Sequence, residues 1–240
     1  KNLKLKIVQV VADKKDKLDR LVQLLSYLGA ESTMIFCNQR DSVERISEVL
    51  KDAGIDCAYF HGKLEQEDRE RTLIRFRNGS IFCLAATDLA ARGLDIPDMK
   101  HVIHFELPMR GEEFTHRNGR TARMEAEGTA YILSHQDDVL PACIAPKPRV
   151  LDLPVGLKAP APSSWVTVYI SGGKKNKLNK MDIVGFLLQK GNLEKSDLGL
   201  IEVKDNISFA AVRREKVKGM LSAIADQKMK GKKYKIEVAR

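Results

Sequence analysis

The chain has 240 residues, of which 43% are hydrophobic and 30% charged, and its formal net charge is +9. These proportions are typical of a globular protein, and the length allows one large domain or two small ones. No apolar run approaches the roughly 20 residues needed to cross a bilayer, so we expect no membrane protein and no membrane partner.

The cysteines and the N-terminus suggest a compartment. The four cysteines are widely spaced without a C-x-x-C motif, and no apolar signal core follows the first residues. We therefore expect a cytoplasmic protein with reduced thiols and no metal site of its own. Because the chain begins with Lys1 rather than Met, we also expect a fragment of a longer protein.

The positive charge is confined to the last third of the chain. Residues 1–163 contain 24 Lys and Arg and 24 Asp and Glu, whereas residues 164–240 contain 17 and 8. A stretch rich in Pro, Ala and Ser lies at the same place and reads as a linker. We therefore expect a domain over 1–140, a linker over 141–163 and a basic domain over 164–240.

In the neutral part, short apolar runs alternate with amphipathic segments. Strands are predicted at 34–37, 57–60, 81–86, 101–105 and 128–133, and helices over 41–50 and 65–78. This alternation predicts an α/β fold, a parallel sheet with helices on both faces. Such sheets bind ligands beyond the carboxyl ends of their strands, so the loops that follow strands are the candidate sites.

Two of these loops carry polar residues suited to a polyanion or a nucleotide. Gly62 follows one strand and would let a polyanion approach the backbone, and Arg69 on the next helix can neutralise a phosphate. Taken alone, this pair is better explained as a turn glycine and a solvated helix face. After the next strand, Thr87 offers a hydroxyl and Asp95 can accept hydrogen bonds from ribose hydroxyls. The alternative is that Asp95 caps the following element and pairs with Arg92.

A third segment, residues 116–123, concentrates positive charge. Arg120 and Arg123 are three residues apart, so on a helical turn both guanidinium groups point the same way, and Arg117 precedes them. Arginine grips phosphate oxygens in two-point contacts and can stabilise the charge on a transferring γ-phosphoryl group. For an isolated arginine pair, a basic surface turn is the alternative.

Taken in order, these segments resemble the C-terminal RecA-like domain of DEAD-box RNA helicases. Residues 34–39 are similar to motif IV, 66–69 to the motif after it, 86–95 to motif V and 116–123 to motif VI. Asn118 departs from the pattern, since motif VI usually carries an apolar residue there. The resemblance implies that Arg120 and Arg123 are arginine fingers, that Asp95 and Arg117 belong to the nucleotide site, and that Gly62, Arg69 and Thr87 contact the RNA backbone.

Two motifs of the helicase family are missing from this sequence. The sequence contains neither a G-x-x-x-x-G-K-[ST] loop nor an Asp-Glu-Ala-Asp string. We therefore expect the chain alone to be inactive, and the full-length parent to use ATP and Mg²⁺ with an N-terminal RecA-like domain that lies upstream or was removed.

The basic part has the element order of a small RNA-binding module. Strands and helices in the order β-α-β-β-α-β predict a ferredoxin-like, RRM-like domain. Phe209 is the only aromatic residue of its third strand, so it is a candidate for base stacking, and core packing is an equal alternative. The cationic residues that would contact phosphates are Lys174, Lys175, Lys177, Arg213, Arg214, Lys232, Lys233 and Lys235.

A helicase core joined to this module resembles the DbpA-type bacterial helicases, which implies structured ribosomal RNA of the large subunit as the partner. We weigh two other classes of protein. One is a non-enzymatic RNA-binding protein on a helicase-like scaffold. The other is a small-molecule α/β enzyme with an unrelated basic tail, which leaves the arginines of residues 116–123 without a partner.

Overall fold

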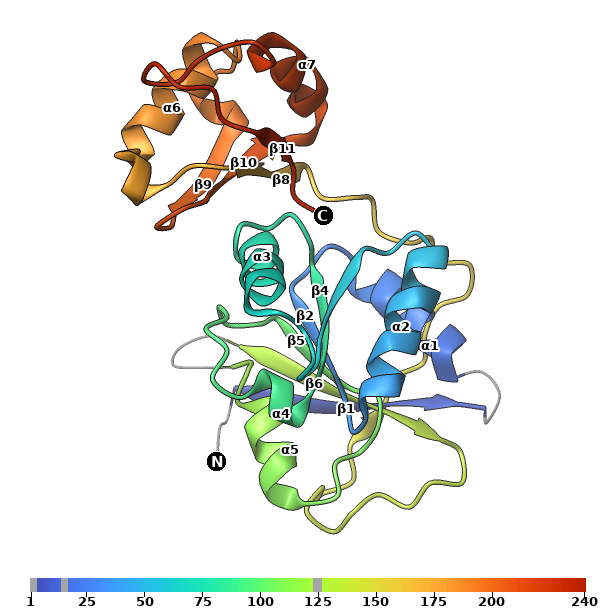
Figure 1. The fold of residues 1–240 in the computed structure, drawn as a ribbon. Helices are drawn as coiled ribbons and strands as arrows, with labels where there is room; N and C mark the ends of the chain where they lie inside the picture. Colours follow the sequence, from blue (N-terminus) through green and yellow to red (C-terminus); the bar gives the residue numbers. More distant parts are fainter. Residues whose placement is uncertain (1–3, 14–16, 123–126) are drawn as a thin grey trace. The chain divides into compact units, whose positions relative to one another are not determined.

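The computed structural model describes residues 4–13, 17–122 and 127–240 (Figure 1). It consists of two compact units. The first contains Lys1–Arg69 and Ile81–Pro162, and the second contains Glu70–Ser80 and Ser163–Arg240. The boundary at Pro162 lies inside the segment for which the sequence predicted a linker.

The first unit is built on a seven-stranded parallel sheet, in the order β3-β4-β2-β5-β6-β1-β7. All five strands predicted from the sequence are present, and two outer ones, β1 and β7, were not predicted. The strands are β1 Leu5–Ala12, β2 Thr33–Cys37, β3 Cys57–Phe60, β4 Cys83–Thr87, β5 His101–His104, β6 Gly128–His135 and β7 Arg149–Val150.

Helices cover both faces of this sheet, as the sequence predicted (Figure 1). On one face, leucines of α1 (Lys17–Leu28) and α2 (Arg40–Asp52) pack on alternate strand residues such as Ile35. On the other face, Phe114 of α5 (Gly111–Asn118) packs on Ile132. The remaining helices are α3 Gln66–Arg77 and the short α4 Asp88–Ala91.

The second unit contains a four-stranded antiparallel sheet in the order β11-β8-β10-β9. Apolar residues of two helices, among them Ile183 and Met220, pack on one of its faces. This arrangement confirms the predicted β-α-β-β-α-β unit. Its elements are β8 Trp165–Ile170, α6 Lys180–Gln189, β9 Leu198–Val203, β10 Ser208–Arg213, α7 Arg214–Ile224 and β11 Ile236–Val238.

Segment Glu70–Ser80 covers part of the opposite face of that sheet. Ile74 packs with Phe209, and the carboxylate of Glu202 accepts two hydrogen bonds from Arg77, at 2.9 and 3.0 Å. Asn78 donates to the hydroxyl of Thr167 at 2.7 Å. Separately, within the described residues no helix is long and apolar enough to span a membrane.

Candidate functional site

The candidate site lies at the carboxyl edge of the parallel sheet, as its topology predicts. Four loops begin there because four neighbouring strands end there. Asn38 follows β2, Gly62 comes two residues after β3, Thr87 ends β4, and Glu106 comes two residues after β5. Motifs that are far apart in the sequence are thereby brought to one edge of the sheet.

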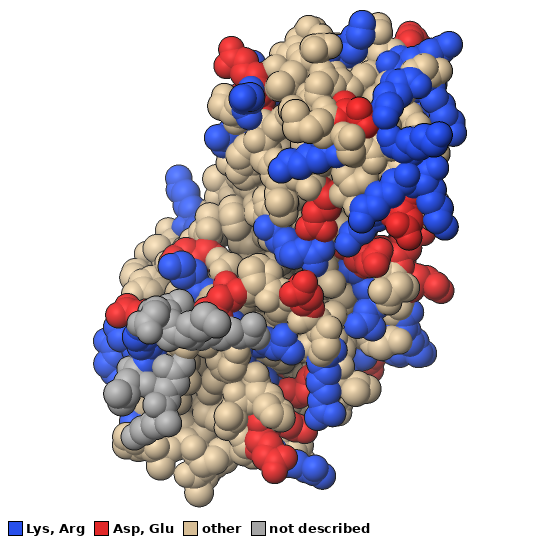
Figure 2. Space-filling view, turned by 90° about the vertical axis from the view of Figure 1, so that its left-hand side faces the viewer, with Lys and Arg blue, Asp and Glu red and all other residues tan. Residues whose placement is uncertain are grey.

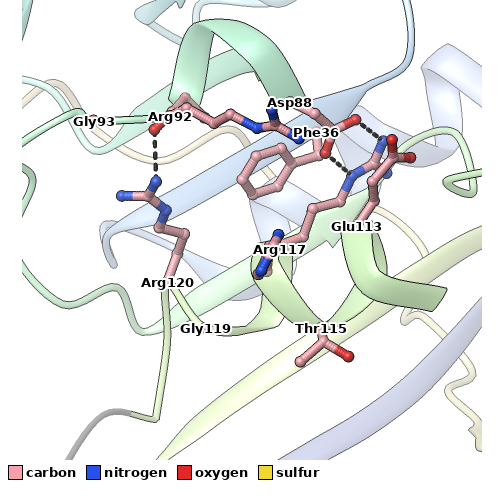
Figure 3. A pocket seen from close by; sticks show the side chains of 11 residues that line it. Phe36, Asp88, Arg92, Gly93, Glu113, Thr115, Arg117, Gly119 and Arg120 are labelled. Atoms are coloured by element: carbon pink, nitrogen blue, oxygen red, sulfur yellow. Dashed lines mark hydrogen bonds and ion pairs between the residues drawn. The ribbon is translucent and has the colours of Figure 1, made fainter. Parts of the chain in front are cut away.

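Arg117, near the end of α5, links three of these loops although its side chain is buried. Its Nε and Nη2 atoms donate to the two carboxylate oxygens of Asp88, both at 2.7 Å (Figure 3). Nη2 also donates to Oδ1 of Asn38 at 2.7 Å, and Nη1 donates to the carbonyl of Glu106 at 2.6 Å. The guanidinium lies 5.4 Å from the centre of the Phe36 ring. A two-point pair of this kind fixes both side chains in one geometry.

A cavity of about 620 Å³ opens next to this network, and its wall includes Arg92, Gly93, Glu113 and Arg120 as well as Arg117 (Figure 3). Arg120 is half-buried. Its guanidinium donates to the carbonyl oxygens of Ala91 at 2.6 Å and of Leu94 at 3.3 Å. These two hydrogen bonds help to hold the side chain at the rim of the cavity.

A second hollow of about 400 Å³ adjoins the first. Thr87 and Asn38 line it together with Asp88 and Arg92, and the side chains of Leu89 and Met109 at its rim are largely exposed. Thr87 also caps α4, because its hydroxyl oxygen accepts the amide hydrogen of Ala90 at 3.3 Å. The loop after β4 therefore presents a fixed hydroxyl at the sheet edge.

The other predicted residues of this unit are less tightly grouped. Gly62 is exposed with open space around it, and the Arg69 guanidinium lies 5.8 Å from the centre of the Phe60 ring. Asp95 is exposed and is not part of the wall of either cavity. Arg123 lies outside the described residues. The roles of these residues stay predictions.

In the second unit, three loops are tied together and carry most of the lysines. The amides of Lys174 and Lys175 donate to the carbonyls of Lys204 and Asp205, both at 2.8 Å. Nζ of Lys230 donates to the carbonyl of Lys177 at 2.8 Å. Figure 2 shows Lys and Arg side chains crowded along one edge of this unit. We use the name lysine edge for the following lysines of the three loops: Lys174, Lys175, Lys177, Lys204, Lys230, Lys232 and Lys233.

Arg213 and Arg214 lie elsewhere. Arg213 pairs with Trp165 at the start of β8, whereas Lys174 and Lys175 follow the end of β8, so the two sets occupy opposite ends of the sheet. The Arg213 guanidinium lies 4.2 Å from the centre of the Trp165 ring, and Arg214 Nε donates to the carbonyl of Ser163 at 2.6 Å. The sequence did not reveal this separation.

Phe209 is 1% exposed. Its ring meets Tyr169 edge-on at 5.9 Å, and Ile74 packs against it. In this arrangement the ring has no free face for a base, which matches the core-packing alternative. Its role in RNA stacking stays a prediction.

Sequence reasoning gave no role to Asn38 and Asp88, although both lie in or beside the motif segments. Their signal was position alone, directly after buried strands. His104, within β5, had no signal in the sequence. Its Nε2 lies 2.7 Å from Oδ1 of Asn118, and burial, together with the Arg117 cation nearby, lowers its pKa to about 3.

The first unit is a RecA-like lobe with cationic side chains at the carboxyl edge of its sheet. A basic β-α-β-β-α-β unit follows it. This combination defines the C-terminal region of a nucleic-acid helicase. Residues 16–125 match the helicase conserved C-terminal domain, and residues 167–238 match the DbpA RNA binding domain. The chain is also similar to the SrmB chain in a crystal structure of this Escherichia coli DEAD-box protein bound to the regulator of ribonuclease activity A. The identity is 32% and the TM-score 0.56, with 65% of this chain and 94% of that chain covered.

The chain therefore belongs to the DEAD-box family of RNA helicases. Curated relatives include the ATP-dependent RNA helicase DbpA of Escherichia coli, 33% identical over 94% of this chain, and that of Bacillus subtilis, 30% identical over 100% of it. This chain covers 51% and 55% of those two proteins, so it spans about half of their length. The structure of Saccharomyces cerevisiae Dbp5 bound to RNA and ADP BeF3 is similar over 54% of this chain and 35% of its own, with 29% identity and a TM-score of 0.51.

Proposed function

We propose that the chain is the C-terminal half of an ATP-dependent RNA helicase that remodels structured RNA. In this proposal Arg120 and Arg123 stabilise charge on the transferring γ-phosphoryl group, Asp95 contacts the ribose, and Arg117 organises the nucleotide site. Gly62, Arg69 and Thr87 contact the RNA backbone. Relatives named as ATP-dependent RNA helicases, and a similar structure bound to RNA and ADP BeF3, support this assignment.

One observation carries the proposal. The pair between Arg117 and Asp88 fixes the end of α5, and Arg120 follows three residues later at the rim of the 620 Å³ cavity. Two of the acceptors of the Arg120 guanidinium are backbone carbonyls, and a phosphate anion attracts a guanidinium more strongly than neutral oxygens of this kind do. A triphosphate held by an N-terminal lobe would therefore draw this side chain across the cavity.

The family implies two bound groups, ATP and Mg²⁺, and the described residues fit them differently. Arginine donors beside a cavity suit the phosphates of ATP. Among the residues that the structure describes, no three His, Cys, Asp or Glu side chains are grouped so as to hold a metal ion. Because proteins usually hold Mg²⁺ through one or two carboxylates together with substrate phosphates and water, we assign no step to that ion here.

For the second unit we propose tethering to structured ribosomal RNA during assembly of the large subunit, in the cytoplasm. The lysine edge supports this because its lysines come from three loops whose backbones are joined by hydrogen bonds, so the loops that carry the charges are held together. A rigid array of charges can match the phosphate spacing of a folded RNA, whereas a flexible tail binds any polyanion.

The enzymatic part is tested in the full-length parent. Arg120→Ala should lower RNA-stimulated ATP hydrolysis on the order of 10³-fold, the loss typical of a removed arginine finger. Arg45→Ala, an exposed arginine on α2, is the matched control and should keep full turnover. Unchanged hydrolysis in the Arg120 variant would contradict the assignment. A parent that binds RNA and hydrolyses no ATP would instead favour a non-enzymatic RNA-binding protein.

The tethering part is tested with this chain. Replacing Lys174, Lys175, Lys232 and Lys233 by Ala should weaken binding to a folded large-subunit rRNA fragment. The slope of log K against log salt should become shallower by roughly 0.7–0.9 for each phosphate that the variant no longer neutralises. Lys216→Ala with Lys218→Ala, two exposed lysines of α7, is the control. An equal weakening per removed charge in the two variants would mean that only total charge matters.

A further inference from the structure

His104 and Asn118 form a buried polar pair that the family motif does not include. His104 is 0% exposed and ends β5, and Asn118 is 5% exposed and ends α5. The His104 ring also stacks on Phe114, with 4.7 Å between ring centres. A buried amide that lacks a partner is costly. In this chain, where Asn118 replaces the usual apolar residue, His104 supplies that partner.

The surroundings of the ring determine its tautomer. Nδ1 of His104 lies 3.5 Å from Nη1 of Arg117, and a guanidinium can only donate. Nδ1 is therefore the acceptor, and Nε2 carries the hydrogen that it donates to Oδ1 of Asn118. If the amide were turned over, the proton would have to sit on Nδ1 and face the Arg117 cation.

This geometry completes the contacts of Arg117. A guanidinium has five N–H bonds. Nε donates to Asp88, Nη2 to Asp88 and Asn38, and Nη1 to the carbonyl of Glu106. The fifth N–H, the second on Nη1, faces Nδ1 of His104. The ring is thus the last acceptor that this buried cation needs.

We propose that His104 and Asn118 are a matched pair of positioning residues. Together they hold Arg117 in its pair with Asp88 and fix the turn that carries Arg120. The link to Arg120 is direct, because its amide donates to the carbonyl of Arg117 at 3.2 Å. The consequence for turnover rests on the proposed function, whereas the structural pairing does not.

NMR on this chain tests the pairing. In the unaltered chain, long-range ¹H–¹⁵N spectra should show His104 neutral with its proton on Nε2. Asn118→Leu and His104→Phe should each speed exchange of the Arg117 Nε–H at least tenfold relative to the Ile35 backbone amide, which reports global unfolding. In the double variant, exchange of the Arg117 Nε–H should speed up about as much as in one single variant, because the effects of coupled partners are not additive. Ile46→Val, a core change in α2, should not alter the ratio.

The proposal would be overturned if the spectra placed the His104 proton on Nδ1. It would also be overturned if the two single-variant effects on the exchange rate multiplied in the double variant. In the full-length parent, Asn118→Leu should lower kcat about tenfold and leave the KM for ATP within about threefold, since a positioning defect acts on the reaction step. Equal turnover of Asn118→Leu and Ile46→Val would also overturn it. If Arg120→Ala left hydrolysis intact, the proposed function would fail, and the exchange data would still decide the pairing.

Discussion

Arg117 and Asp88 form a two-point ion pair in which both N···O distances are 2.7 Å and the arginine side chain is fully buried. The pair joins the end of α5 to the start of α4. A buried guanidinium stays charged, so every acceptor around it contributes to the stability of the unit.

Removing the carboxylate should therefore destabilise the protein. We expect Asp88→Ala to lower the free energy of unfolding by about 3–5 kcal/mol, because it leaves a buried cation without its counter-charge. Urea denaturation of this chain measures the loss. Glu48→Ala, an exposed acidic residue on α2, should change stability by less than about 0.5 kcal/mol. Equal losses in the two variants would show that the pair contributes nothing specific.

Ala122 has a strained backbone in the turn after α5. Its φ is +54°, a conformation that costs an L-residue about 1–2 kcal/mol, and its side chain is buried. Ala122→Gly should therefore raise the free energy of unfolding by up to about 1 kcal/mol, since glycine relieves this strain. Thermal denaturation measures the change. Ala130→Gly, a buried alanine within β6, should be destabilising. A lower free energy of unfolding in both variants would contradict the inference that the Ala122 backbone is strained.

Gly173 holds two loops of the second unit together. A Cβ atom at this position would overlap the backbone of Lys204 and Asp205. Gly173→Ala should therefore separate the loops, cost about 1–3 kcal/mol of stability and weaken RNA binding. Gly219 in α7 has open space around it, so Gly219→Ala should stabilise by about 0.5–1 kcal/mol and leave binding unchanged. Fluorescence titration with RNA, beside thermal melting, measures both.

His104 gives a pH dependence of stability. Its folded pKa of about 3 lies below the ordinary value of 6.5, because burial and the Arg117 cation disfavour the charged ring. Between those values the unfolded chain binds the extra proton. Stability linked to His104 is therefore complete above pH 6.5 and is lost as the pH falls toward 3, by up to about 1.4 kcal/mol per pH unit.

His104→Phe removes this dependence. The difference in unfolding free energy between the unaltered chain and the variant, followed by urea denaturation from about pH 7 to about pH 4, should shrink steadily as the pH falls. Ile46→Val, a core change in α2 that alters no titratable group, is the control and should give a constant difference. A constant difference for His104→Phe as well would mean that the ring titrates normally.

Local pattern predicted much of this architecture. The apolar strands, the helices over 41–50 and 65–78 and the β-α-β-β-α-β order all follow from short-range periodicity, which needs no knowledge of partners. Helix α1 was missed, although Leu21, Leu24, Leu25 and Leu28 have helical spacing. Residues Arg149–Val150 were assigned to a linker, and they form a strand only because β1 offers an edge to pair with.

The amino-acid sequence alone was enough for the two kinds of fold, the segregation of charge and the arginine-rich segment, because each depends on residue type and spacing. Only the tertiary structure decided which residues meet. Asn118 looked like a departure from a motif until His104 was found 2.7 Å away. For Phe209 the sequence left base stacking and core packing open, and the structure shows that the ring packs with Ile74. Hydrogen bonds and burial act over a few ångströms in space, and spacing along the chain carries no record of those distances.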